Sequence, residues 1–520
     1  MKTKVKFVLS TLVAAAAMNS TMLAADVYVS SDYNSSTEGW GTTRFSSYSS
    51  ALSYCSANNK KANIVIEKTN TISGNCIDQN THKNLTSLNV IVKDGATLGN
   101  ALSKWDMTYA VTVEAGGVLQ TARGTSSDHG NSHIKKVLTI GEAGEGKETA
   151  YVKFQNAGTG YKTASIAVLY NGKLVANNAD IAVGDLGFSG RATITDSVVD
   201  VEGIVAFGKN NFYSQSMANT TMTVKGHNLM NENTYYSTEG TILHKLTMTN
   251  SSITVDDGVE GTVAEAVTIK NLTMKSGSAL TVEAGTAVKV TGNFELNDSS
   301  LNVGVLANSG TITVSGESYL EATEITGNKI VVSKGATLTL SSSSLLAMVD
   351  NKNGGTGNIS FNKVEAESQV KDVNKITLKN ADGKAVELSS GTGTITVNVA
   401  SEITDASEIS VIEAVSGGVV LAAWSFNIDN GEGENKTGVT VTMDVGEGQV
   451  LESLRILHEE NGEWTDVTSV VTDKKLENGK LSFTAKDFSG YAVATPEPSM
   501  FGLMAGLGAL VLVGTRRRRK

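Results

Sequence analysis

Asn219-Thr220-Thr221-Met222-Thr223-Val224 and Asn250-Ser251-Ser252-Ile253-Thr254-Val255 are two copies of the pattern that decides the fold. In each copy an Asx residue precedes two small residues, an apolar residue, a polar residue and a valine. The apolar-polar-valine triplet is typical of a short strand with two side chains on one face. An Asx side chain that bonds its own backbone caps a turn. Each copy therefore predicts a turn followed by a strand.

The pattern recurs along much of the chain. Further copies begin at Asn178, Asp196 and Asp298, and the start-to-start spacings are 18, 23, 31 and 48 residues, the last being about two repeats long. A second turn signal, Gly-Ala-Thr-Leu, begins at Gly95 and Gly335. A repeat of about 20 to 24 residues is the length of one coil of a parallel β-solenoid. The repeats therefore predict stacked coils, each paired with the coil above and the coil below.

The composition favours the same fold class. The 520 residues include only two prolines, Pro496 and Pro498, and 18% charged residues. Proline removes a donor from a strand ladder, so a proline-free body suits long sheets. The net charge of −10 argues against nucleic-acid partners, because an acidic body repels phosphates. We expect an all-β chain with a parallel β-solenoid at 61–404. An array of Thr-rich β-sandwiches is the alternative.

The first 25 residues have the features of an export signal. Lys2, Lys4 and Lys6 precede a short apolar segment, and small residues at Ala24 and Ala25 follow it. This order is expected of a secretory signal peptide. We therefore interpret residues 1–25 as a signal removed on export, with an uncut N-terminal anchor as the alternative.

Residues 26–60 are expected to form an N-terminal cap. Phe45, Tyr48, Leu52 and Cys55 fall on one face of a short amphipathic helix. A helix over the first coil would protect an otherwise open sheet edge. This stretch resembles the N-terminal cap of right-handed β-helix proteins, such as pectate lyases, and of autotransporter passengers. The resemblance implies a right-handed solenoid.

The C-terminal tail, residues 495–520, has three parts. Pro496-Glu497-Pro498 comes first, and the residues from Pro498 to Thr515 carry no charge. As a helix this segment would be roughly 27 Å long, which is just enough to cross a bilayer. A basic cluster that would stay in the cytoplasm follows it and consists of Arg516, Arg517, Arg518, Arg519 and Lys520.

This tail resembles the PEP-CTERM sorting signal of Gram-negative bacteria. The motif, the apolar segment and the arginine cluster occur in the same order as in that family. The resemblance implies an exosortase-type membrane transpeptidase as the partner, which would cut near the motif. It also implies transient anchoring in the inner membrane before delivery to the cell envelope, the outer surface or the extracellular matrix. Some names used for this tail refer to ice-binding proteins. An ordinary C-terminal anchor is the alternative.

Residues 405–494 have a different sequence pattern from the predicted solenoid. Apolar residues occupy every odd position from Val439 to Val445, and Asn461-Gly462 is a strong hairpin signal. Core side chains are expected at Leu481, Phe483, Phe488, Tyr491 and Val493. We interpret this segment as a small antiparallel β-sandwich that covers the last coil.

Candidate chemical groups are few. Cys55 and Cys76 are the only cysteines, and in an exported protein such a pair predicts a disulfide, with two buried thiols as the alternative. His129 and His133 lie in a Gly-, Asn- and Ser-containing segment, and the acidic run at 256–260 lacks the spacing of a calcium loop. We therefore expect no metal and no cofactor.

The predicted function follows from these parts. Outward positions of the repeats are mainly Ser, Thr and Asn, and no pair of catalytic carboxylates stands out, so we expect no enzyme. The prediction is an exported structural or adhesive surface protein, with a surface polysaccharide as a further candidate partner. A secreted β-helix enzyme that degrades polysaccharides is the alternative. Recurring Thr-x-Thr pairs, such as Thr221 and Thr223, make an ice-binding solenoid a minor alternative.

Overall fold

The computed structural model describes residues 24–58, 61–72, 84–100, 106–121, 131–154, 165–208, 213–225, 240–255, 267–282, 286–350, 358–380, 382–391, 394–431, 438–485 and 487–496. With 58% of residues in strands and 8% in helices, the chain is mostly β and has a long parallel sheet, so the predicted fold class is confirmed at this level. Unit 1 holds the described residues up to Ile312 together with Thr326–Asn328. Unit 2 holds Thr313–Ile325 and the described residues from Lys329 on.

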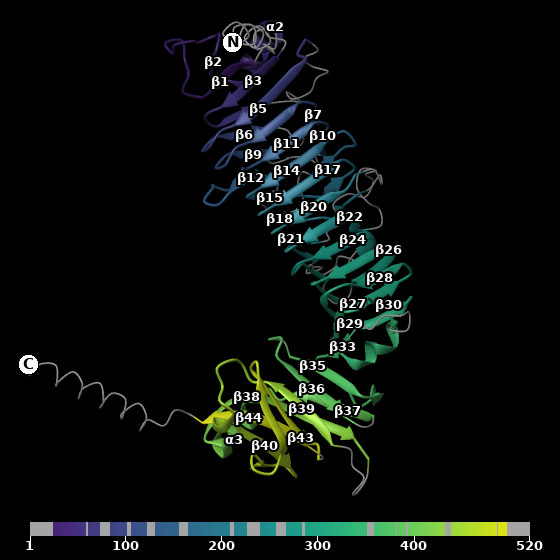
Figure 1. Cartoon of the computed structure of the whole chain (residues 1–520). Coiled ribbons are helices and arrows are strands. Elements are labelled where there is room, and N and C mark those ends of the chain that lie inside the picture. Colours follow the sequence, from purple (N-terminus) through teal and green to yellow (C-terminus); the bar gives the residue numbers. More distant parts are fainter. Residues whose placement is uncertain are drawn as a thin grey trace, which may run out of the picture. The chain divides into compact units, whose positions relative to one another are not determined.

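Unit 1 consists of three parallel ladders of strands, in which most strands pair with the strand three places further along the chain (Figure 1). This arrangement is consistent with a parallel solenoid whose coils contribute one strand to each ladder. Ladder A contains β1 (Ala25–Val29), β3 (Lys61–Ile66), β5 (Ser87–Val92), β8 (Ala110–Val113), β11 (Val137–Ile140), β14 (Lys173–Asn177), β17 (Arg191–Thr195), β20 (Gln215–Ala218), and the second halves of β22 (Ile242–Thr249), β24 (Val267–Lys275) and β26 (Ala287–Asn297).

The other two ladders complete each coil. Ladder B contains β4 (Asn70–Ile72), β6 (Thr97–Asn100), β9 (Val118–Thr121), β12 (Ala150–Lys153), β15 (Ala179–Val183), β18 (Val198–Val201), β21 (Thr221–Val224), β23 (Ser252–Val255), β25 (Ala279–Val282) and β27 (Ser300–Asn308). Ladder C contains β7 (Asp106–Met107), β10 (Asn131–Ile134), β13 (Ser165–Val168), β16 (Leu186–Phe188), β19 (Val205–Ala206), the first halves of β22, β24 and β26, and the second half of β27.

The apolar positions of the repeat form the core between the ladders. In the apolar-polar-valine triplet of β18, Val199 and Val201 are buried while Asp200 between them points outward. Parallel pairing aligns Val199 with Met222 and Ile253 in the next coils. Each such side chain contributes about 1.5–3 kcal/mol when it is fully buried. The repeat thus builds a continuous apolar column along ladder B.

The Asx residue of each repeat forms the corner between ladders A and B. Five Asx residues there have a positive φ of 46–49°, namely Asn178, Asp196, Asn219, Asn250 and Asp298. Asn and Asp tolerate this left-handed conformation better than other residues with a Cβ. The side chains of Asn178, Asn219 and Asn250 each donate a hydrogen bond to another coil. The Asn219 amide donates to Asp196 Oδ1 at 2.8 Å, and the Asn250 amide donates to Asn219 Oδ1 at 2.9 Å.

A second column, made of buried hydroxyls, follows directly after the Asx corner. Ser251 Oγ accepts a hydrogen bond from the backbone N–H of Thr220 in the preceding coil, at 3.1 Å, and donates to the carbonyl of Thr249 at 2.9 Å. Ser197 makes the same two contacts with Ala179 and Thr195. The first small residue of the pattern therefore satisfies backbone groups that the corner would otherwise bury unpaired.

The predicted N-terminal cap is confirmed as a helix over the first strands. Helix α2 (Tyr48–Asn58) buries Tyr48, Ala51, Leu52 and Cys55 and contacts β1, β3 and β4. Phe45 precedes the helix in β2 (Arg44–Phe45) and is also buried. The buried Asn70 accepts a hydrogen bond from the Tyr48 N–H at 3.1 Å and donates to the Ser46 carbonyl at 3.2 Å. This side chain fixes the start of the helix on the first coils.

Unit 2 begins with parallel strands and ends with two antiparallel sheets. Its parallel strands are β29 (Glu317–Gly327), which pairs with β31 (Thr337–Leu340), then β33 (Asn358–Phe361) and β35 (Lys375–Lys379), and β30 (Ile330–Val332), which pairs with β32 (Val349–Asp350). β28 (Thr311–Val314) lies where the units divide, and a 3-10 helix (Ser343–Met348) follows β31. β35 also pairs antiparallel with β36 (Ala385–Ser390), so the parallel sheet continues into the antiparallel one.

One antiparallel sheet extends from β36 through β39 (Val439–Asp444) and β43 (Lys480–Ala485) to β42 (Thr472–Glu477). The other has the order β34 (Val370–Val373), β37 (Ile395–Glu402), β38 (Gly418–Asp429), β44 (Gly490–Pro496), β40 (Arg455–Glu460), β41 (Glu463–Asp466). The rings of Phe483 and Tyr491, one from each sheet, lie 5.4 Å apart. The antiparallel pairing therefore begins earlier than the predicted boundary at residue 404, because 385–402 already pair in this way.

Several sequence expectations in this part are confirmed. β39 alternates buried and half-buried residues, and Leu481, Phe483, Tyr491 and Val493 are buried, whereas Phe488 is only half-buried. The Asn461-Gly462 turn has two positive φ values and joins β40 to β41. Helix α3 (Ala406–Ser416) was not predicted. It packs against β38, β40, β41 and β44, where its Ile412 joins a cluster with Trp464 and Ala494.

Candidate functional site

The described residues include the first residue of the predicted sorting motif. Pro496 is the last residue of β44, where it is aligned with Gly418 of β38. Glu497, Pro498 and the basic cluster from Arg516 to Lys520 lie outside the described residues, as does the predicted membrane segment. Among the helices of the described ranges, none is long and apolar enough to cross a bilayer.

The predicted disulfide remains a prediction. Cys55 is a buried free thiol on the inner face of α2 in this structure, and burial raises its pKa to about 11. Cys76 lies outside the described residues.

A group of carboxylates lies on the outer face of ladder B. Asp180 of β15 and Asp200 of β18 point outward from neighbouring strands, which are about 4.8 Å apart. Their register is offset by two residues, because Asp180 is aligned with Val198 and Asp200 with Ala182. The two carboxylates are therefore diagonal neighbours on one face.

A lysine completes this group. Lys225 follows β21, and its ammonium lies 2.7 Å from Glu202 Oε1 of the preceding coil. Burial and the Asp180 carboxylate raise the pKa of Asp200 above its ordinary value, whereas the charge of Lys225 lowers it. Two neighbouring carboxyl groups, one of which has a raised pKa, are an arrangement that general acid–base chemistry uses. Sequence reasoning missed this pair because its members are 20 positions apart and meet only through the strand register.

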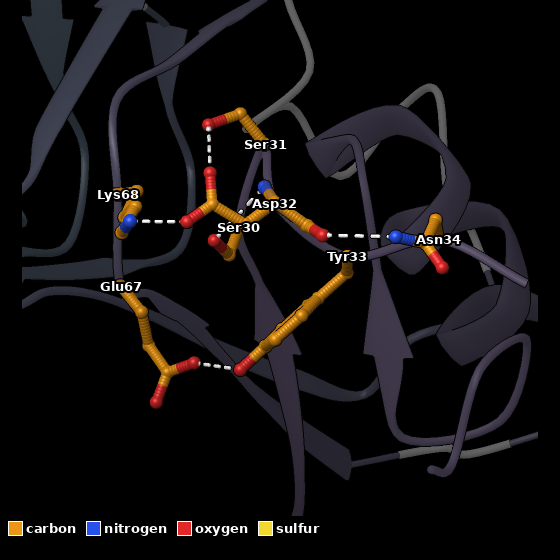
Figure 2. Close-up of polar contacts among 7 residues, drawn as sticks. All are labelled: Ser30, Ser31, Asp32, Tyr33, Asn34, Glu67 and Lys68. Atoms are coloured by element: carbon orange, nitrogen blue, oxygen red, sulfur yellow. Dashed lines mark hydrogen bonds and ion pairs between the residues drawn. The ribbon is translucent and has the colours of Figure 1, made fainter. Parts of the chain in front are cut away.

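A second polar cluster fastens the loop that follows β1 (Figure 2). The Tyr33 hydroxyl donates to Glu67, and Lys68 forms an ion pair with Asp32. The Arg44 guanidinium lies 5.7 Å from the ring centroids of both Tyr28 and Tyr33. Burial and the Glu67 carboxylate raise the pKa of Tyr33. The Asn34 amide donates to the Asp32 carbonyl within the loop, while Tyr33 and Asp32 bind Glu67 and Lys68 after β3, so these contacts hold the loop against the next coil.

The remaining candidates do not form a site in the described chain. His133 lies on β10, while His129 and residues 256–260 lie outside the described residues. Within the ranges that the structure describes, no three His, Cys, Asp or Glu side chains are grouped to hold a metal. Thr221 and Thr223 share β21, but the aligned residues are Val198 and Asp200 on β18 and Ser252 and Thr254 on β23. The paired threonines are therefore not repeated on the neighbouring strands.

The comparisons with known proteins do not show which family this chain belongs to. No protein-family model matches this chain, and neither the curated proteins nor the solved structures contain a significant match.

Proposed function

We propose that this chain is an exported structural or adhesive protein, held at the surface or in the matrix of a Gram-negative bacterium. An exosortase-type transpeptidase would recognise the Pro496-Glu497-Pro498 motif after the tail has entered the inner membrane. The single observation that carries this proposal is the position of Pro496. Pro496 is aligned with Gly418 of β38, so cleavage beyond it would leave this pairing of the sheet intact.

The finer fold is part of the same proposal. We interpret the three ladders as a right-handed β-solenoid, since parallel crossover connections are right-handed in nearly all known cases. The two antiparallel sheets of unit 2 form a small β-sandwich next to the exit of the tail. The residues 1–25 act as the signal peptide, and the apolar tail acts as a transmembrane helix.

Cell fractionation tests the sorting step. The full chain and a double variant, Glu497→Ala with Pro498→Ala, are produced in the native host, with Ser499→Ala as the matched control. We expect the wild-type chain and the control at the cell surface in processed form. The double variant should stay in the inner membrane at full length, because the transpeptidase would no longer recognise the motif. An identical distribution of all three proteins would contradict the proposal.

The carboxylate group on ladder B favours a second candidate function, which is cleavage of a polysaccharide. Asp200, whose pKa is raised, would act as the acid with Asp180 as its partner carboxylate, and the outer face of ladder B would hold the sugar chain. The full chain is incubated with a panel of polysaccharides, and reducing ends or unsaturated products are measured. If products form, and if Asp200→Asn abolishes them while Asp382→Asn leaves them unchanged, the protein is an enzyme and the structural proposal is wrong. Absence of products from the whole panel supports the structural role.

A further inference from the structure

A line of basic side chains follows the corner between ladders C and A in unit 1. We call this line the basic corner and define it by five residues. Lys136 precedes β11, Lys173 begins β14, Arg191 begins β17, and Lys245 and Lys270 lie at the bends within β22 and β24. Figure 1 shows β11, β14, β17, β20, β22 and β24 in consecutive order, so the five cations come from nearby coils.

The strand register aligns these cations along the stack of coils. Lys173 is aligned with Val137, the residue after Lys136, and Arg191 is aligned with Lys173. The backbone N–H of Lys173 donates to the Lys136 carbonyl at 2.6 Å. Lys245 and Lys270 lie at the register shift between the adjacent strands β22 and β24. Burial lowers the pKa of His244 at this shift, and the charges of both lysines lower it further. Neighbouring strands are about 4.8 Å apart, so the cations form a row.

The segments that form the basic corner carry no acidic residue of their own. The segments 134–137, 169–173, 189–191, 213–215, 244–246 and 270–271 contain no aspartate or glutamate, although the whole chain has a net charge of −10. Lys136, Lys173 and Arg191 are exposed, and none of the three has an ion pair with another described residue. Their positive charge is therefore available to a ligand.

Two tyrosines lie beside the row. Tyr170 is 46% exposed, and its ring centroid is 5.3 Å from that of Tyr213. The Arg191 guanidinium lies 4.7 Å from the centroid of the Tyr213 ring, which fixes the arginine at one end of this aromatic pair. Aromatics are only 6% of the chain, so an exposed ring next to the cations is an unusual feature of this surface.

We propose that the basic corner binds an anionic polysaccharide that runs along the coils, with its carboxylate or sulfate groups on the cations and a sugar ring against Tyr170. A polysaccharide fits better than a nucleic acid. The row is one cation wide, whereas the acidic body around it repels the dense phosphates of a duplex. This inference names the class of ligand for the proposed adhesive role. It rests on the proposed function only in that export would bring the protein and the polysaccharide into the same compartment.

Binding to purified polymers tests the inference, with the full chain kept in a mild detergent. Dextran sulfate and uncharged dextran share one backbone, alginate supplies carboxylates, and duplex DNA represents the other class of polyanion. The test variant carries Lys136→Gln, Lys173→Gln and Arg191→Gln. The matched control carries Lys329→Gln, Lys334→Gln and Lys371→Gln, which removes the same charge from exposed positions of unit 2. A thermal denaturation curve checks that both variants fold.

We expect dextran sulfate or alginate to bind, dextran not to bind, and added salt to weaken binding. The test variant should lose about tenfold in affinity, equivalent to about 1.4 kcal/mol, while the control keeps it. Tyr170→Ala should weaken polysaccharide binding without changing its dependence on salt. Equal affinities of the two triple variants, tighter binding of DNA than of both polysaccharides, or no binding to any charged polymer would each overturn the inference. Both triple variants carry the same basic tail, Arg516 to Lys520, so a difference between their affinities reports on the basic corner and not on the tail.

Discussion

The left-handed Asx residues show how single side chains hold one coil to the next. Asn219 has a φ of 48°, and it both donates an amide hydrogen bond to Asp196 and accepts one from Asn250. The sequence predicts the turn, since Asx residues favour turns. It does not predict the bond between coils, because residues 23 and 31 positions away become neighbours only when the coil length is known.

Substitution of Asn219 tests this corner. Asn219→Ala should lower the free energy of unfolding by about 1–2 kcal/mol, because alanine disfavours the left-handed conformation and lacks the amide. Asn219→Gly should cost less, since glycine adopts a positive φ freely. Chemical denaturation measures the midpoints. Asn302→Ala, at an outward position of β27 with ordinary φ, is the control, and an equal loss there would contradict the role of the corner.

Asp200 gives a prediction about pH. Its pKa is raised above the ordinary value, so the folded state favours the protonated carboxyl. The stabilising effect of this preference is present below the ordinary aspartate pKa and is lost as the pH rises through the raised pKa. Asp200→Asn, which stays neutral, should therefore raise the denaturation midpoint at neutral pH and leave it unchanged in acid. Asp382→Asn on an exposed loop serves as the control. If Asp200→Asn changes the denaturation midpoint by the same amount at neutral and at acidic pH, the prediction is contradicted.

At the scale of elements, helix α3 has clear capping signals in a segment that otherwise has a strand pattern. Asp405 accepts hydrogen bonds from the N–H groups of Ser407 and Glu408 at 2.9 and 3.0 Å, and Gly417 ends the helix with a φ of 66°. An Asx cap, a Glu three residues later and a terminal glycine are ordinary helix signals. The segments on both sides of these helix signals have the alternating pattern of strands, which favours a continuous β-structure. Helix α2 and the Asn461-Gly462 hairpin, by contrast, follow directly from local patterns.

The end of α3 can be tested by a pair of glycine substitutions. Gly417→Ala should lower the free energy of unfolding by about 1 kcal/mol, because a Cβ disfavours the positive φ although no atom lies within 4 Å of it. Gly391→Ala, which also enters open space but lacks a positive φ, should be nearly neutral. Denaturation midpoints of the two variants decide the matter. A similar loss at both positions would show that the backbone conformation at Gly417 is not the cause.

At the scale of the whole chain, repeats and composition predict the class of fold but not its contacts. Coil length and the inward apolar triplets are local, so the parallel ladders could be expected. The diagonal placement of Asp180 and Asp200 and the line of cations from Lys136 to Lys270 depend on which strands align, and the irregular spacing of the repeats conceals that alignment. The sequence does not predict that the antiparallel sheets start before residue 404, because strands β36 and β37 have the same pattern of apolar and polar residues as the solenoid strands.

The intact mass of the mature protein from its native cells tests export and sorting together. The proposed signal peptide and sorting tail are at the two ends of the sequence, so one measurement tests the processing of both. We expect a chain that begins near Asp26 and ends close to Pro496, with or without a group attached at its new C-terminus. A mass that corresponds to all 520 residues, from Met1 to Lys520, would contradict the proposed processing at both ends.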